Sequence, residues 1–145
     1  MIKALLPGVP TPAALLGLGG VIPFAAAAAG SFADGASGAW AQFGLLAYGA
    51  VILSFLGGIH WGLALARDVP GMRELGIGVL PSLAGWAGLL VGGAAGLLLL
   101  TAGFLAVLVV DVGLTRGGAA PPWFARLRGV LTGAVCLCLL MATLA

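Results

Sequence analysis

The sequence predicts an all-α integral membrane protein, folded as a bundle of five transmembrane helices. Hydrophobic residues make up 62% of its 145 residues and charged residues only 7%, whereas a typical soluble domain has about 25% charged residues. The apolar residues fall in five segments, and a helix needs roughly 20 of them to cross a bilayer. None of the segments alternates between polar and apolar residues as the strands of a membrane barrel do. Because only helices and closed barrels satisfy the backbone in lipid, we expect helices.

Glycine, proline and charged residues separate the five segments. The expected spans are residues 12–29, 40–67, 75–91, 95–114 and 123–144. The second span ends before residues 68–71, whose Asp-Val-Pro-Gly sequence is typical of a turn. The apolar run from Leu75 to Val110 is too long for one span, and we divide it at the glycine-rich residues 91–96. The short connections leave no room for a soluble domain, so residues 1–145 are expected to form one transmembrane domain.

Every basic residue falls on one side of the membrane when the chain is threaded through five spans. These residues are Lys3, Arg67, Arg73, Arg116, Arg126 and Arg128. Asp34 is the charged residue expected on the opposite side. Because Lys and Arg collect in cytoplasmic loops, we expect the N-terminus in the cytoplasm and the C-terminus outside.

The first segment has an alternative interpretation as a cleaved signal peptide. Lys3 precedes an apolar run that ends in three alanines, residues 27–29, which is the order of features in such a peptide. The run is longer than the usual apolar region of a signal peptide, and it contains Pro12 and Pro23. We therefore favour a transmembrane span; cleavage would leave four spans with the same orientation.

Small residues recur at four-residue intervals on three of the spans. The stripes are Ser54, Gly58 and Gly62 on the second span, Ala84, Gly88, Gly92 and Gly96 on the third, and Ala125, Gly129 and Gly133 on the fifth. Such stripes let helix backbones approach closely within a membrane. They are expected to be helix-packing positions.

His60 is the only histidine and lies inside the second span. An ionisable side chain at membrane depth costs at least a few kcal/mol unless it faces a partner or a water-filled cavity. At about 100° per residue, His60 lies roughly 160° around the helix from the stripe that contains Gly58 and Gly62. The two features therefore face different neighbours. His60 either forms a hydrogen bond with a neighbouring helix or belongs to a functional site.

Asp111 is a second ionisable residue within an apolar segment, at a similar depth on the same side. A carboxylate there requires a cation or hydrogen-bond donors, and the short loop before the fifth span makes Arg126 or Arg128 the expected partner. One interpretation is a structural ion pair. The other interpretation is a functional cavity on the cytoplasmic side, lined by His60, Asp111 and an arginine, with Trp61 beside them. This cavity would bind an anionic or quinone-like head group, or the residues would relay a proton.

Other chemistry finds little support in the sequence. Four acidic residues and one histidine leave little material for acid–base catalysis, so we do not expect an enzyme. We expect no metal and no cofactor: haem ligation by His60 would lack a second histidine, and Cys136 and Cys138 are expected to be packing residues. The net charge of +2, with no basic stripe, argues against nucleic acid.

Several stretches resemble the transmembrane protein 69 family, a group of small bacterial and mitochondrial inner-membrane proteins with a domain of unknown function. The first stretch is residues 48–62, which include Ser-Phe-Leu-Gly-Gly-Ile-His-Trp-Gly, and the second is residues 80–83, followed by Trp86. The others are Asp111, residues 122–124, Leu127-Arg128 and Leu131-Thr132. The family often has Tyr at the position of Phe124. The resemblance covers roughly residues 10–142. It implies a five-span protein of the bacterial inner (plasma) membrane and points to His60, Trp61, Asp111 and Arg128. It implies no activity.

Two functions from different classes remain. The first, which we favour narrowly, is a non-enzymatic accessory or assembly protein that packs in the bilayer against itself or a larger inner-membrane complex. The second is a small binding or transport protein with a polar cavity around His60 and Asp111, with a quinone among its candidate ligands. A cavity beside these residues would favour the second function, and a close-packed bundle the first.

Overall fold

The computed structural model describes residues 6–145 and contains five helices in this part of the chain. The helices are α2 (Thr11–Gly30), α3 (Gly35–Leu65), α4 (Met72–Val91), α5 (Gly93–Arg116) and α6 (Pro122–Ala142). All five are long and apolar enough to cross a membrane. The predicted all-α fold with five spans is therefore confirmed. Lys3, which contributed to the predicted orientation, lies outside the described residues.

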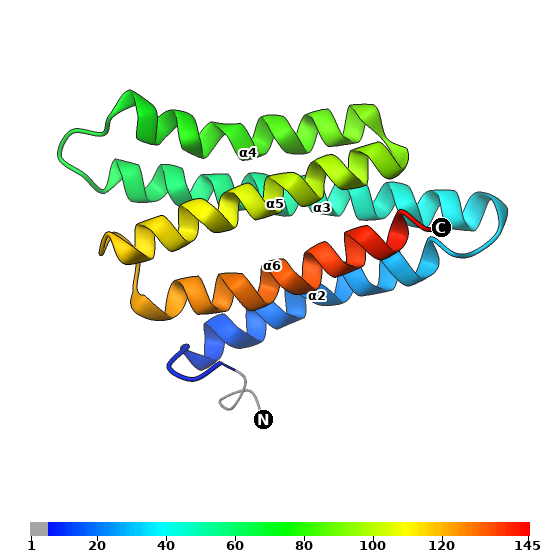
Figure 1. Cartoon of the computed structure of the whole chain (residues 1–145), viewed down its shortest axis with the longest axis horizontal. Coiled ribbons are helices and arrows are strands. Elements are labelled where there is room, and N and C mark those ends of the chain that lie inside the picture. Colours follow the sequence, from blue (N-terminus) through cyan, green and yellow to red (C-terminus); the bar gives the residue numbers. More distant parts are fainter. Residues whose placement is uncertain (1–5) are drawn as a thin grey trace.

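The helices form a ring in which neighbours in sequence are neighbours in space (Figure 1). Contacts between α2 and α6 close the ring, and α3 also packs against α5 across it. The centre of the bundle is filled by fully buried side chains, among them Leu53 of α3, Leu100 and Phe104 of α5, and Leu139 of α6. This apolar core packs α3, α5 and α6 together, and these helices carry every buried polar residue of the described chain except Ser31, which follows α2.

The expected boundaries are close to the observed ones except at the start of the second span. We expected that span to begin at residue 40, but α3 begins at Gly35. The preceding turn is tight: a Cβ added to Gly38 would lie 2.0 Å from the carbonyl oxygen of Ala33. The extra residues give α3 31 residues, or about 46 Å at a rise of about 1.5 Å per residue. It is longer than the roughly 30 Å hydrocarbon core of a bilayer.

The break predicted within residues 91–96 lies at two glycines with left-handed backbone conformations. Gly92 has φ 65° and Gly93 has φ 52°, values that glycine adopts without steric cost. Gly92 thus forms the turn between α4 and α5, where we had expected a packing position. On the two sides of the turn, Gly88 of α4 and Gly96 of α5 bring the helices together, since a Cβ on Gly96 would lie 2.4 Å from the carbonyl oxygen of Gly88.

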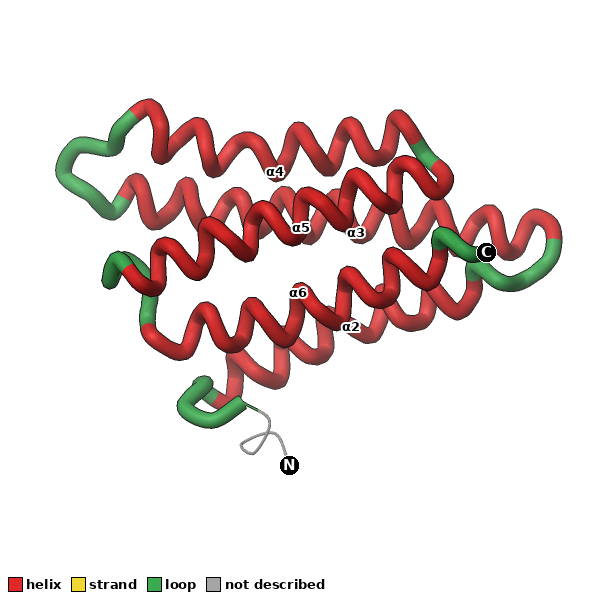
Figure 2. The backbone as a smooth tube through the Cα atoms, viewed as in Figure 1, coloured by secondary structure: helices red, strands yellow, loops and turns green. Residues whose placement is uncertain are grey.

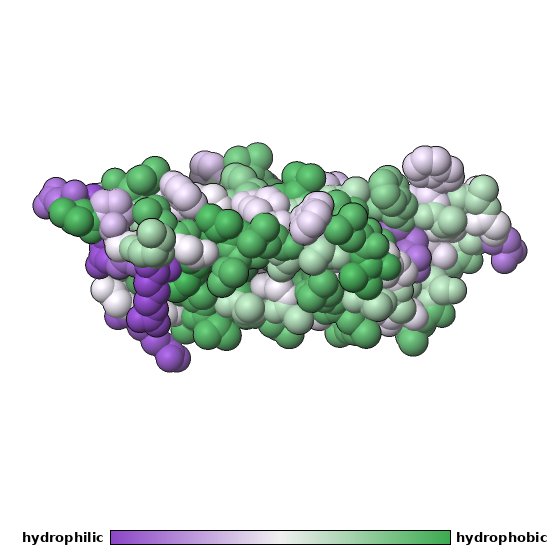
Figure 3. Space-filling view, turned by 90° about the horizontal axis from the view of Figure 1, so that it is seen from above, coloured by the Kyte–Doolittle hydropathy of each residue, from purple (hydrophilic) through white to green (hydrophobic). Residues whose placement is uncertain are grey.

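Charged residues gather at one end of the bundle, which we call the charged end. It comprises the loops at residues 66–71 and 117–121, the helix ends that flank these loops, and the start of α2, which lie together in Figure 2. Its charged residues are Arg67, Asp68, Arg73, Glu74, Arg116 and Arg126. Figure 3 shows hydrophilic residues at the ends of the molecule and mostly hydrophobic residues along its length. This distribution is that expected of a bundle that crosses a membrane.

The glycines of the predicted packing stripes on α3 and α6 make no contact between the helices of this chain. Gly58 and Gly62 of α3, and Gly129 and Gly133 of α6, have no atom of another helix within 4 Å of an added Cβ. The close contact on α3 is made instead by Gly57, whose added Cβ would lie 2.4 Å from the carbonyl oxygen of Gly78 on α4. The reason is helix rotation: Leu53, Gly57, His60 and Ala64 form the buried face of α3, and Ser54, Gly58 and Gly62 lie on another face.

Candidate functional site

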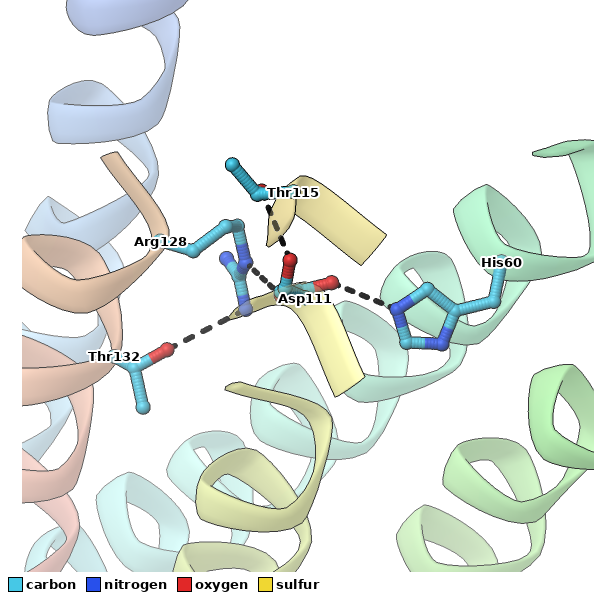
Figure 4. Close-up of polar contacts among 5 residues, drawn as sticks. All are labelled: His60, Asp111, Thr115, Arg128 and Thr132. Atoms are coloured by element: carbon cyan, nitrogen blue, oxygen red, sulfur yellow. Dashed lines mark hydrogen bonds and ion pairs between the residues drawn. The ribbon is translucent and has the colours of Figure 1, made fainter. Parts of the chain in front are cut away.

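A carboxylate from α5 lies between a histidine from α3 and an arginine from α6 (Figure 4). Asp111 is 1% exposed, His60 5% and Arg128 7%. Each residue lies five or six positions from the charged end of its helix, which is about 8 Å at about 1.5 Å per residue. The three ionisable side chains thus meet inside the bundle at one depth. We call them the His60–Asp111–Arg128 cluster.

Both carboxylate oxygens of Asp111 have a donor. Nε2 of His60 lies 2.7 Å from Oδ1, and Nε of Arg128 donates to Oδ2 at 2.8 Å. Because an ionised carboxylate only accepts hydrogen bonds, Nε2 of His60 carries the proton that it donates. The pairing compensates a charge that would otherwise cost several kcal/mol in this environment.

Arg128 continues the cluster toward α6. Its Nη2 donates to Oγ1 of Thr132 at 3.4 Å, and Thr132 is itself buried. Thr132 follows Arg128 by one helical turn, so the two side chains share a face of α6. We did not predict a role for Thr132, although its four-residue spacing from Arg128 could have indicated it. Nη1 of Arg128 makes no hydrogen bond with any described residue.

The structure separates two of the candidate residues from the cluster. The ion pair predicted for Asp111 forms with Arg128, whereas Arg126 is exposed and donates a hydrogen bond to the carbonyl oxygen of Pro7. Arg126 and Arg128 are two positions apart and so point to different sides of α6. Trp61 is 38% exposed, and its side chain takes part in none of the hydrogen bonds that the described residues form with the cluster.

A large apolar pocket borders the cluster at Arg128. Its volume is about 410 Å³, and its walls come from α2, α3, α5 and α6. Apart from Arg128 and Thr132, the lining side chains are aliphatic or aromatic, including Trp123 and Phe124 at the charged end. We call this space the Arg128 pocket. It exists because α2 and α3 lie close near Gly20 and Tyr48 and diverge toward the charged end (Figure 1).

Two smaller cavities border the cluster at His60, between α3, α4 and α5. The first, the end cavity, has a volume of about 130 Å³ and is also lined by Arg67, Glu74 and Ala119 of the charged end. The second, the lipid-side cavity, has a volume of about 170 Å³ and is lined by apolar residues apart from His60. Asp111 lines none of the three spaces. It separates the Arg128 pocket from the two cavities at His60.

No group of three or more His, Cys, Asp or Glu side chains that could hold a metal ion occurs among residues 6–145. The two cysteines are free: Cys136 is buried and Cys138 is half-buried. Cys136 belongs to the apolar core, and Cys138 packs against that core.

Comparison with known proteins gives two matches. A family described as "Protein of unknown function (DUF3429)" matches residues 9–144. "Transmembrane protein 69" of Xenopus tropicalis is 38% identical over 138 residues, which is 90% of this chain and 53% of the frog protein. The chain therefore spans about half the length of that relative. No solved structure matches the chain.

Proposed function

The chain belongs to the DUF3429 family of proteins of unknown function, and from that premise we propose that it binds a lipid-like molecule inside the membrane. The molecule's polar head group, an anionic or quinone-like group, accepts hydrogen bonds from Arg128. Its apolar part occupies the Arg128 pocket. Asp111 holds the arginine in place through its hydrogen bond to Nε, and His60 in turn bonds to Asp111.

The observation that carries this proposal is the combination of a large apolar space with one buried cation. Ligand pockets generally measure about 300–1,000 Å³ and are mostly apolar with a few polar groups. The Arg128 pocket has both properties, with a volume of about 410 Å³ and with Arg128 and Thr132 as its polar groups. An oily molecule with one acceptor-rich end matches that distribution.

The rim of the pocket indicates how such a molecule would enter. Leu16 of α2 and Phe55 of α3 line the pocket and are also exposed on the surface of the bundle. Both residues lie in membrane-spanning segments, so the opening between them faces lipid. A ligand already dissolved in the bilayer would reach Arg128 without crossing water.

The geometry of Arg128 supports a role for it in binding. Asp111 and Thr132 fix Nε and Nη2, which leaves Nη1 for an acceptor. A guanidinium already held by a carboxylate loses little further freedom when it binds a ligand. Asp111 would thus position Arg128 and have no contact with the head group.

The proposal can be tested with a variant whose new side chain fills the pocket while Arg128 is left unchanged. Gly20 lines the pocket, and an added Cβ there would meet only the hydroxyl of Tyr48, at 3.8 Å. Gly19 is next to it on the same helix, outside the pocket, with open space around an added Cβ. Gly20→Leu therefore occupies the pocket, and Gly19→Leu makes the same chemical change on the outer surface as a matched control.

Each purified protein in nanodiscs would be labelled with two photoactivatable probes, a long-chain fatty acid and a ubiquinone analogue. We expect one of them to label α2 or α6 of the wild type and of Gly19→Leu in competition with its unlabelled form, and to label Gly20→Leu several-fold less. The fatty acid alone would indicate an anionic head group, and the quinone alone a neutral one. Equal labelling of both variants by both probes would refute the proposal.

A second candidate function is the accessory or assembly role that the sequence favoured. The observation that favours it is the open surface at Gly58 and Gly62 on α3 and at Gly129 and Gly133 on α6. Small residues of this kind allow another helix to approach closely. The Arg128 pocket makes the binding role the better supported of the two, because an assembly protein has no need of a buried cation beside a large apolar space.

We also propose that the charged end faces the cytoplasm across a bacterial inner membrane. Arg67, Arg73, Arg116 and Arg126 all belong to that end, and the turn between α2 and α3 at the opposite end carries Asp34. The positive-inside rule supports this orientation, with the N-terminus in the cytoplasm and the C-terminus outside.

A further inference from the structure

Nδ1 of His60 is a fully buried polar atom to which no described residue offers a hydrogen bond. Figure 4 shows this nitrogen on the side of the ring that faces away from Asp111. Because Nε2 carries the proton donated to Asp111, Nδ1 of the neutral imidazole is an acceptor. A buried acceptor without a donor costs about 1–3 kcal/mol. A small molecule that donates a hydrogen bond to Nδ1 would remove this cost.

The His60 side chain borders empty space between α3, α4 and α5. His60 lines both the end cavity and the lipid-side cavity. The end cavity, about 130 Å³ in volume, reaches from His60 to Arg67 and Glu74 at the charged end. One water needs about 10–15 Å³ of such volume, so several waters fit. The polar groups at both ends of this cavity supply the partners that buried water requires.

Pro81 creates a second unpaired acceptor in this part of α4. Proline has no backbone N–H, so Pro81 leaves the carbonyl of Ile77, four residues earlier in α4, without its usual helical donor. Ile77 lines both cavities that His60 lines. Gly57 and Gly78 hold this part of α4 directly against α3. Nδ1 of His60 and the carbonyl of Ile77 are thus two acceptors without a donor, on residues that line the same two cavities.

We infer that the end cavity is a water-filled entry from the charged end to His60, and that His60 is a proton-binding site. A water in the cavity donates to Nδ1 of the neutral imidazole. When a hydronium ion arrives by the same path, its proton moves to Nδ1, the hydronium becomes water, and the imidazolium keeps its Nε2–H bond to Asp111. The inference does not depend on the ligand of the Arg128 pocket, which lies on the other side of Asp111.

The charged groups around His60 determine the energy of that protonation. Asp111 of α5 contacts the ring and stabilises the imidazolium, while Arg128 of α6, on the other carboxylate oxygen, opposes it. Arg67 and Glu74 line the mouth of the cavity and form an ion pair with each other. Their opposite charges partly cancel, so Asp111 is the group that favours a proton at Nδ1.

The single histidine makes a direct experiment possible. Protein labelled with ¹⁵N-histidine, purified with a histidine-free affinity tag and placed in nanodiscs, gives the two ring nitrogens of His60 without overlap in solid-state NMR. At neutral or alkaline pH we expect an acceptor-type Nδ1 that receives magnetisation from water, and on acidification its shift moves to the protonated value. An Nδ1 without water contact and without change down to the pH of unfolding would overturn the inference.

Two alanine-to-leucine variants test the path. Ala64 lines the end cavity and Ala106 lines the lipid-side cavity. We expect Ala64→Leu to lose most of the transfer from water to Nδ1, and Ala106→Leu to keep it. Equal transfer in both variants would show that water does not arrive from the charged end. Thermal unfolding of each variant establishes that it is folded, and Ala64→Gly replaces Ala64→Leu if the latter is not, with increased transfer as the expected result.

Discussion

Nε2 of His60 lies 2.7 Å from Oδ1 of Asp111, although 51 positions separate the two residues in the sequence. The contact joins α3 to α5, and the bond from Arg128 to the other oxygen of Asp111 joins α5 to α6. One buried carboxylate thus connects three of the five helices. Each partner makes its own bond to a different oxygen of Asp111, so the consequences of removing each partner can be predicted separately.

Removal of the carboxylate should be the most damaging change in the cluster. Asp111→Ala leaves Arg128 buried without its counter-ion and His60 without its acceptor. Loss of one partner of a buried pair costs about 3–5 kcal/mol. We expect that reduction in the free energy of unfolding, measured by denaturation in mild detergent. Asp34→Ala is the control, because Asp34 makes no side-chain cap bond at the start of α3; equal stability of the two variants would contradict the prediction.

The double variant Asp111→Leu with Arg128→Met should recover the part of the stability lost in Asp111→Ala that comes from Arg128 without a counter-ion, while His60 stays without its acceptor. Replacing a buried ion pair by apolar residues of similar size is often neutral or stabilising, because both desolvation costs disappear together. The measurement is the same denaturation. A double variant as unstable as Asp111→Ala would mean that the cluster stabilises the bundle through more than charge compensation. The same variant should lose labelling of the Arg128 pocket.

His60→Ala should weaken the protein less than Asp111→Ala and leave insertion and topology intact. Asp111 loses one donor but keeps Arg128, so its charge remains compensated. A hydrogen bond to a charged group contributes about 1.5–3 kcal/mol, and we expect a loss of that size. Size-exclusion chromatography and thermal unfolding in detergent are the measurements. Complete loss of folded protein would instead assign His60 a structural role that the fold requires.

Two adjacent glycines on α3 should respond in opposite ways to the same substitution. Gly57→Ala places a Cβ 2.4 Å from the carbonyl oxygen of Gly78, so α3 and α4 must move apart; overpacking of this kind costs about 1–3 kcal/mol. Gly58→Ala meets open space and should be neutral or stabilising by up to about 1 kcal/mol, because alanine favours helix. Comparing their unfolding midpoints checks the prediction. A more damaging effect at Gly58 would point to a helix of another molecule on that surface.

Reporter fusions test the proposed orientation. A phosphatase that is active only outside the cytoplasm should be active after Ala145 and inactive in the loop at residues 66–71. A fluorescent protein that folds only in the cytoplasm should give the opposite pattern. The physical reason is the excess of Arg over Asp and Glu in the loops and flanking helix ends of the charged end. Fluorescence of the C-terminal fusion would show that the C-terminus lies in the cytoplasm and that the proposed orientation is wrong.

The candidate site could be predicted only in part. His60 and Asp111 stand out because an ionisable group in an apolar segment needs a partner, and the loop length limited that partner to Arg126 or Arg128. The structure selects Arg128 because Arg126 points to the bundle surface and bonds to Pro7. The glycines at Gly58 and Gly129 make no contact within the bundle, because a small residue fits a lipid-facing side of a helix as well as a buried one.

The sequence by itself determined the membrane location, the number of helices and the end at which charge collects. These properties depend on the apolarity of consecutive residues, which is local. Only the tertiary structure decided that Asp111 bonds to both His60 and Arg128, that Gly57 packs against α4, and that cavities lie on both sides of the carboxylate. These properties depend on the rotation of each helix about its axis and on the divergence of α2 from α3. Contacts between residues far apart in the chain fix both.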